Sequence, residues 1–107
     1  MIYEWRIYEA MPGKMSALND RFRKITLKLF EKHDIKVVGF WESIIGTSNL
    51  LYYMLVYDNM AHREKVWNAF RADQEWIKAR RETEKGGPLV QRVVNTLLRP
   101  TSYSPMK

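Results

Sequence analysis

Residues 2 to 9 read Ile-Tyr-Glu-Trp-Arg-Ile-Tyr-Glu, and this stretch decides the fold. An apolar set alternates with a more polar set along it, namely Tyr3, Trp5 and Ile7 against Glu4, Arg6 and Tyr8. A period of two residues is typical of a β-strand whose two faces differ. The sequence therefore predicts a first strand that ends at the turn Met11-Pro12-Gly13.

The segment after this turn has the period of an amphipathic helix. From Lys14 onward, apolar residues recur at steps of three and four, and they are Met15, Leu18, Phe22, Ile25 and Leu29. Basic residues lie among and beside them, namely Lys14, Arg21, Lys24 and Lys28. We expect a helix of about five turns that ends near His33-Asp34.

Two β-rich runs and a second helical region follow. Residues 35–45 and 50–57 are rich in β-branched and aromatic side chains, and the intervening Gly46-Thr47-Ser48-Asn49 has turn chemistry, so a hairpin is expected. Val66, Trp67 and Phe70 then indicate a helix. Asp73 is suited to cap a new helix, so a break is predicted near residue 73.

The last regular segment is a β-branched run over residues 89–98, followed by an irregular tail over 99–107. The resulting order is strand, helix, strand, strand, helix, strand. With right-handed crossovers, this order gives an α+β, ferredoxin-like βαββαβ fold in which both helical regions cover one face of a four-stranded antiparallel sheet. At 107 residues, the chain is expected to form a single domain over 1–107.

This architecture leaves one sheet face bare, and a soluble protein rarely exposes so large an apolar surface. Since helices need an apolar surface to pack on, we expect the Tyr3, Trp5, Ile7 side of the first strand to face them and the Glu4, Arg6, Tyr8 side to be bare. On the third and second strands we place Tyr53, Leu55, Tyr57 and Trp41 on the bare face as well. Hydrophobicity does not fix the orientation of the last strand, where Gln91 and Asn95 alternate with Arg92 and Thr96.

A second copy of the chain that covers the bare face would enclose an acid, a guanidinium, phenols and an indole in an apolar cavity, as in many small-molecule sites. The candidate ligand-binding residues are Glu4, Arg6, Tyr8, Trp41, Tyr53, Tyr57 and Asn95. Two structural alternatives stay open. Glu4 and Arg6 can instead form an ion pair that fixes dimer register, and the aromatic side chains can serve only in packing.

The composition excludes several classes of function. Without cysteine there is no disulfide scaffold, thiolate metal site or thiol catalysis, and with only His33 and His62 no metal site is expected. Phosphate-binding loops, dinucleotide fingerprints and nucleophile elbows are absent, so we expect no cofactor. Glu4 and Arg6 interrupt any signal peptide, and no stretch is apolar enough to span a bilayer, so a cytoplasmic location is expected.

Short motifs are spread along nearly the whole chain, at residues 3–8 and 12–14, 38–41 and 45–46, 57–58, Arg63, 73–76, 97–100 and 104–105. In their order and spacing, these motifs resemble the NIPSNAP family of the dimeric α/β-barrel superfamily. The resemblance implies a ferredoxin-like subunit that pairs sheet to sheet with a second copy. Members of the wider superfamily include cofactor-independent monooxygenases, isomerases and haem-degrading enzymes.

Not all of the family pattern carries over. Many members have a His and a Trp on the third strand, where this chain has Tyr53 and Leu55, so no catalytic role attached to those side chains is expected. The positions of Glu4, Arg6, Trp41 and Tyr57 do match. Haem degradation needs an axial histidine in the cavity, and neither histidine is placed there.

The net charge of +6 and the aromatic sheet face are compatible with three functions. The favoured one is a homodimer that binds a small organic molecule, with or without catalysis. The alternative is a non-catalytic structural or protein-interaction module. Nucleic acid is not expected as a partner, because residues 49–58 lack the pattern of an RNA-recognition motif and Glu4 would repel phosphate.

Overall fold

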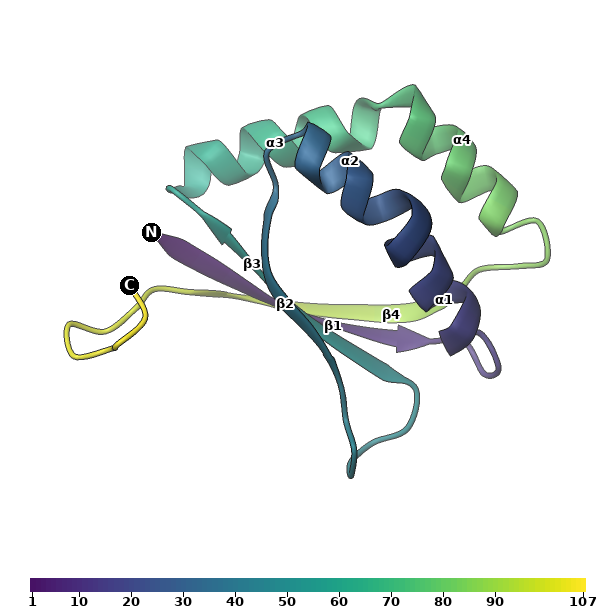
Figure 1. The fold of residues 1–107 in the computed structure, drawn as a ribbon, viewed down its shortest axis with the longest axis horizontal. Helices are drawn as coiled ribbons and strands as arrows, with labels where there is room; N and C mark the ends of the chain where they lie inside the picture. Colours follow the sequence, from purple (N-terminus) through teal and green to yellow (C-terminus); the bar gives the residue numbers. More distant parts are fainter.

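The first strand, β1 (Ile2–Ala10), is an interior strand of a four-stranded antiparallel sheet in the computed structural model, which describes residues 1–107. Its neighbours are β3 (Leu50–Tyr57) and β4 (Val90–Leu98), and β2 (Lys36–Glu42) pairs with the outer side of β3. The order across the sheet is β2-β3-β1-β4 (Figure 1). The four predicted strands are confirmed, although β2 ends three residues earlier than expected.

The first helical region is continuous but not uniform. It consists of α1 (Met15–Arg21), a π-helical turn η1 (Phe22–Thr26) and α2 (Leu27–Lys32). The Thr26 hydroxyl donates to the backbone carbonyl of Arg21, five residues earlier, at 3.3 Å. The sequence pattern predicted the helix but not the π turn, a feature that often occurs at functional sites.

The second helical region is broken at Asp73, as predicted. Asn59 caps α3 (Met60–Ala72), because its side chain accepts from the backbone N–H of His62 at 2.8 Å. Asp73 caps α4 (Gln74–Thr83) in the same way through the N–H of Glu75. A cap satisfies backbone donors that a helix start leaves unpaired, and this is why the helix can restart at a new angle.

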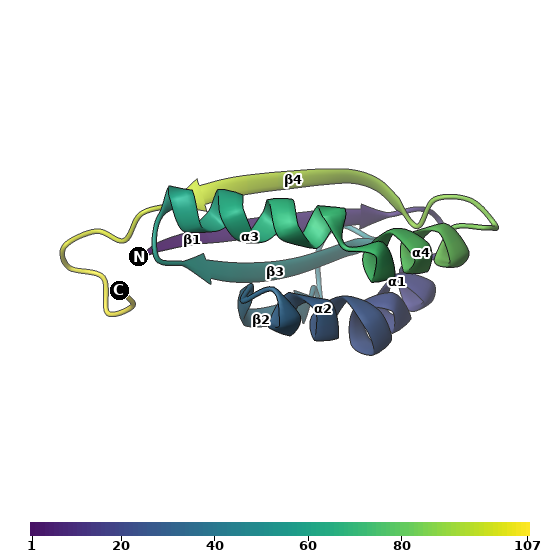
Figure 2. The same cartoon turned by 90° about the horizontal axis from the view of Figure 1, so that it is seen from above.

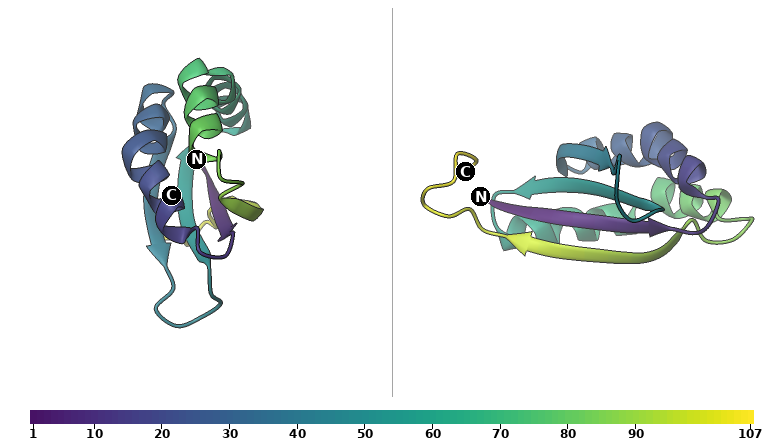
Figure 3. Two further views of the ribbon diagram at one scale, coloured as in Figure 1. Left: turned by 90° about the vertical axis from the view of Figure 1, so that its right-hand side faces the viewer. Right: turned by 90° about the horizontal axis from the view of Figure 1, so that it is seen from below.

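All helices lie on one side of the sheet. Seen from above, they lie in front of the strands (Figure 2), and seen from below, the strands face the viewer and the helices lie behind (Figure 3, right). This arrangement confirms the predicted ferredoxin-like α+β fold. No helix is both long enough and apolar enough to cross a membrane.

The prediction of which sheet face the helices cover was wrong. Glu4, Arg6 and Tyr8 lie on the covered face, and so do Tyr53 and Tyr57, which are almost completely buried. The prediction assumed that charged and phenolic groups avoid an interior. Here they enter it because they satisfy one another's hydrogen bonds, and no buried polar side-chain atom lacks a partner.

The open face of the sheet is accordingly the apolar one. Trp5 packs against Trp41 and Tyr52, with ring centroids 5.7 and 5.8 Å apart. Trp41 is 48% exposed, so its outward placement was correct, but it lies on the opposite side of the sheet from Glu4 and Arg6. Other residues on this face are Tyr3, Ile7, Met54, Val56, Val94 and Leu98.

Candidate functional site

The Glu4 carboxylate is the centre of a buried polar network. Its side chain has 0% exposure and accepts five hydrogen bonds from four side chains. Arg63 of α3 donates from Nε to Oε1 at 3.1 Å and from Nη2 to Oε2 at 2.9 Å. Arg6, Tyr57 and Asn95 donate the other three, at 2.8, 2.7 and 2.7 Å. Glu4 thus joins three strands and one helix.

These partners keep Glu4 ionised. Burial alone raises the pKa of the carboxyl, but hydrogen bonds from Arg63, Asn95 and Tyr57 and the charge of Arg6 outweigh it and lower the pKa to about 2. The phenol of Tyr57 shows the opposite effect, because burial and the adjacent carboxylate raise its pKa. Glu4 therefore stays ionised, and the lone pairs of its oxygens accept hydrogen bonds from side chains of the protein itself.

Arg6 is held in one orientation by this network. Its Nη1 donates to Glu4, its Nε donates to the Tyr53 hydroxyl at 2.7 Å, and its Nη2 donates to the Tyr8 hydroxyl at 3.2 Å. The guanidinium also lies over the Trp67 ring, 4.7 Å from its centroid. Burial by itself lowers the pKa of Arg6, but the surrounding oxygens raise it above its ordinary value, so the side chain is a permanent cation.

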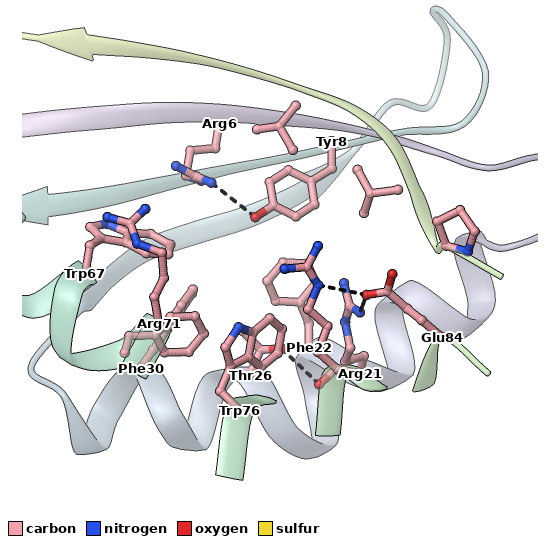
Figure 4. A pocket seen from close by; sticks show the side chains of 15 residues that line it. Arg6, Tyr8, Arg21, Phe22, Thr26, Phe30, Trp67, Arg71, Trp76 and Glu84 are labelled. Atoms are coloured by element: carbon pink, nitrogen blue, oxygen red, sulfur yellow. Dashed lines mark hydrogen bonds and ion pairs between the residues drawn. The ribbon is translucent and has the colours of Figure 1, made fainter. Parts of the chain in front are cut away.

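Arg6 and Tyr8 reach a cavity of about 270 Å³ between the sheet and the helices (Figure 4). Its aromatic wall comes from both helical regions and comprises Phe22, Phe30, Trp67, Phe70 and Trp76. Val90 and Val93 of β4 and Pro88 of the preceding loop complete the wall. The π turn places Phe22 and Thr26 on this wall, and Phe22 packs against Tyr8 and Tyr53 with centroids 5.6 and 5.3 Å apart.

Further arginines line the same cavity. Arg21 is buried, lies 5.3 Å from the centroid of the Trp76 ring and donates to Glu84 at 2.9 Å. Arg80 donates to the same oxygen of Glu84 at 3.1 Å. Arg71 contacts the Trp67 ring, 5.6 Å from its centroid, and has no carboxylate partner. The cavity is therefore aromatic and cationic.

Comparison with known proteins identifies the chain's relatives. A family profile described as NIPSNAP matches residues 3–105. The chain belongs to the NIPSNAP family. The NipSnap homolog 3A proteins of Homo sapiens and Pongo abelii are each 35% identical over 77 residues, which is 71% of this chain. The matched region spans about a third of those relatives (30%).

Solved structures share the fold of this NIPSNAP chain. A NIPSNAP family protein from Agrobacterium tumefaciens aligns with a TM-score of 0.88 at 24% identity, covering 99% of this chain and 98% of the other. A putative antibiotic biosynthesis monooxygenase from Nitrosomonas europaea aligns with a TM-score of 0.64 at 9% identity, covering 94% and 98%. At these identities, the likeness concerns the fold alone.

In this NIPSNAP chain, six of the seven candidate residues form one hydrogen-bonded cluster, consisting of Glu4, Arg6, Tyr8, Tyr53, Tyr57 and Asn95. Only Arg6 and Tyr8 line the cavity, and the other four lie behind them. Trp41 is on the open face and takes no part. The predicted grouping thus survives, although it faces the helices and not the open side of the sheet.

Sequence reasoning missed the contribution of the helices to this site. Arg63 and Trp67 were not among the candidates, yet both contact the Glu4 and Arg6 pair. A signal was present, because Arg63, Val66, Trp67 and Phe70 follow helical spacing and therefore share one face of α3. An arginine on an otherwise apolar helix face indicates a buried anion opposite it.

The two histidines lie outside the cavity. His33 contacts the Asp73 carboxylate through Nε2 at 2.6 Å, and His62 contacts Asp34 at 3.1 Å. Hydrogen bonds from His33 and Lys32 hold the pKa of Asp73 well below its usual range. The same contacts join the end of α2 to the residue that caps α4. No group of three or more metal-ligating side chains gathers in this structure.

Proposed function

We propose that this NIPSNAP chain binds a small organic molecule in the cavity between its sheet and its helices, and does so as a homodimer paired through the open sheet face. The observation that carries the proposal is the way Arg6 is held at the cavity wall. Three hydrogen bonds and the Trp67 ring fix a cation beside apolar space, which is the usual composition of a ligand site.

The size and wall of the cavity support a ligand with one or two rings. At about 270 Å³, it lies near the lower end of small-molecule sites. Aromatic walls from α2, α3 and α4 offer both faces and edges to a planar ring. A purely structural core would instead fill this space with side chains, because protein interiors are close-packed.

Dimerisation is supported by the open face of the sheet. Trp5, Trp41, Tyr52 and Met54 form an apolar surface that no element of this chain covers. Val94 of β4 is 47% exposed on the same face. Large contiguous apolar patches on soluble proteins mark interaction surfaces, and a second copy presents the same apolar chemistry.

Binding can be tested with one-ring probes and NMR of the four tryptophan indole N–H groups. Trp67 and Trp76 line the cavity, whereas Trp5 and Trp41 lie on the open face and act as internal controls. The probes are benzyl alcohol, phenylacetamide and phenylacetate. We expect at least one of them to shift the Trp67 and Trp76 signals saturably while the Trp5 and Trp41 signals stay in place.

A matched pair of variants localises the binding. Val93 and Leu97 lie on the same strand and the same face, with 41% and 39% exposure, but only Val93 lines the cavity. Val93→Phe should weaken probe binding, and Leu97→Phe should not. If no probe shifts the cavity indoles, or if both variants behave alike, the cavity does not bind ligands and an interaction module becomes the better assignment.

A further inference from the structure

The charges around the cavity define the class of ligand more closely. Its wall carries four arginines, Arg6, Arg21, Arg71 and Arg80, and a single carboxylate, Glu84. Glu84 is already paired within the protein, because one of its oxygens accepts hydrogen bonds from both Arg21 and Arg80. Arg71 is left without a carboxylate partner. Since Arg6 is already paired with the buried Glu4 behind it, the excess of positive charge comes from Arg21, Arg71 and Arg80 over Glu84, and it would repel a cationic ligand and attract an anion.

Arg6 retains hydrogen-bonding capacity toward such an anion. A guanidinium carries five N–H donors, and Arg6 makes three hydrogen bonds within the protein, to Tyr53, Glu4 and Tyr8. Two donors remain on a group whose orientation is already fixed. Arginine in a fixed orientation is suited to a planar carboxylate, because the spacing of its donors matches the two oxygens.

The hydroxyl of Tyr8 is a second group, after the Arg6 guanidinium, that can donate a hydrogen bond to a ligand. The buried Tyr53 hydroxyl accepts from Arg6 Nε and donates to the Tyr8 oxygen at 2.9 Å. The Tyr8 oxygen also accepts from Arg6 Nη2. Its lone pairs are thus occupied, and its own proton has no acceptor within the protein. Since Tyr8 lines the cavity, this proton is available to a ligand (Figure 4).

From this arrangement we infer that the ligand is an aromatic carboxylate, with its carboxyl group on the free donors of Arg6 and Tyr8 and its ring against the wall formed by Phe22, Trp67 and Trp76. This inference rests on the proposed function, since it names the ligand class for the same cavity. Arg71 and Arg80 at the rim favour the approach of an anion, because positive charge around a cleft raises the local concentration of anions.

The test compares phenylacetate with phenylacetamide, which has the same ring and nearly the same shape but no charge. Titration of the wild-type protein, followed at the Trp67 and Trp76 indoles, should give at least tenfold tighter binding for phenylacetate. Added salt should weaken phenylacetate binding and leave phenylacetamide binding unchanged. Equal affinities, or binding of benzyl alcohol alone, would overturn the carboxylate assignment while the cavity proposal stands, and binding of none of the three probes would overturn both.

Two pairs of variants assign the contacts. Tyr8→Phe removes one hydroxyl and should weaken phenylacetate about tenfold and phenylacetamide only about threefold, since a hydrogen bond to a charged acceptor is stronger than one to a neutral carbonyl. Tyr3→Phe, on the open face, should change neither. Arg71→Gln should weaken phenylacetate about threefold, whereas Arg99→Gln, an equal charge change away from the cavity, should not. Unchanged phenylacetate binding in Tyr8→Phe would overturn the hydrogen-bond arrangement proposed here.

Discussion

Arg63 of α3 donates hydrogen bonds to both carboxylate oxygens of Glu4 of β1, with donor to acceptor distances of 3.1 and 2.9 Å. This contact explains how a charged side chain can sit in the middle of the sheet. Arg63 pairs with the carboxylate in bidentate geometry, and the remaining lone pairs of the carboxylate accept hydrogen bonds from Arg6, Tyr57 and Asn95. Arg6 in turn owes its orientation at the cavity to the anion behind it.

Neutralising this anion should destabilise the protein. Glu4→Gln keeps the shape of the side chain but leaves Arg6 and Arg63 without a buried counter-charge. The free energy of unfolding, measured by urea denaturation at pH 7, should fall by about 3 to 5 kcal/mol. Glu9→Gln on the same strand removes only the half-exposed pair with Arg92 and should cost less than about 1 kcal/mol. Equal losses would contradict a special role for Glu4.

Acid should remove the same contribution. The folded state lowers the pKa of Glu4 from its usual 4.5 to about 2, so the unfolded chain binds the proton more readily. A lowered pKa gives stability that is fully present above pH 5 and is lost as the pH falls toward 2. The loss in the wild type is on the order of 3 kcal/mol. Between pH 5 and 2, Glu4→Gln should show a shallower decline than the wild type, and Glu9→Gln should retain the steep one.

The bidentate geometry itself can be tested with Arg63→Lys. Lysine keeps the charge but offers a compact ammonium in place of the planar guanidinium, so it cannot serve both carboxylate oxygens in the same way. We expect a loss of about 1 to 2 kcal/mol in the free energy of unfolding. Arg23→Lys, in the exposed pair with Asp20, should change it by less than about 0.5 kcal/mol. If Arg63→Lys left the free energy of unfolding unchanged, the positive charge alone would be enough to stabilise Glu4.

The sequence predicted the order of the elements because periodicity is a local property. Alternation over residues 2–9, the helical stripe from Met15 and the cap at Asp73 all depend on neighbours within one or two turns. The π turn at Phe22–Thr26 could not be predicted in this way. It occurs where Phe22 packs against Tyr8 and Tyr53, and these residues are distant in sequence.

The face of the sheet could not be assigned from the strands one at a time. Glu4 and Arg6 looked like solvent-facing residues when β1 was considered alone. Their burial depends on donors from three other elements, Tyr57 on β3, Arg63 on α3 and Asn95 on β4. Polar groups enter a core only as a complete network, so a residue-by-residue rule of polarity reversed the orientation of the whole strand.

The proposed homodimer gives a prediction for the open face. Val94→Glu places one charge on that face in each copy, and sheet-to-sheet pairing would bury both. We expect the dimer dissociation constant, measured by sedimentation equilibrium, to rise roughly a hundredfold, because two like charges cannot be buried together without a counter-ion. Ile45→Glu introduces the same charge at a side chain that is 94% exposed in the β2 to β3 loop, outside the sheet, and should leave the constant unchanged.

Because β4 presents Val94 and the cavity-lining Val93 to opposite sides of the sheet, a probe bound to Val94→Glu monomers should still shift the Trp67 signal. A wild-type protein that stays monomeric, or a Val94→Glu variant that dimerises as the wild type does, would contradict pairing through this face.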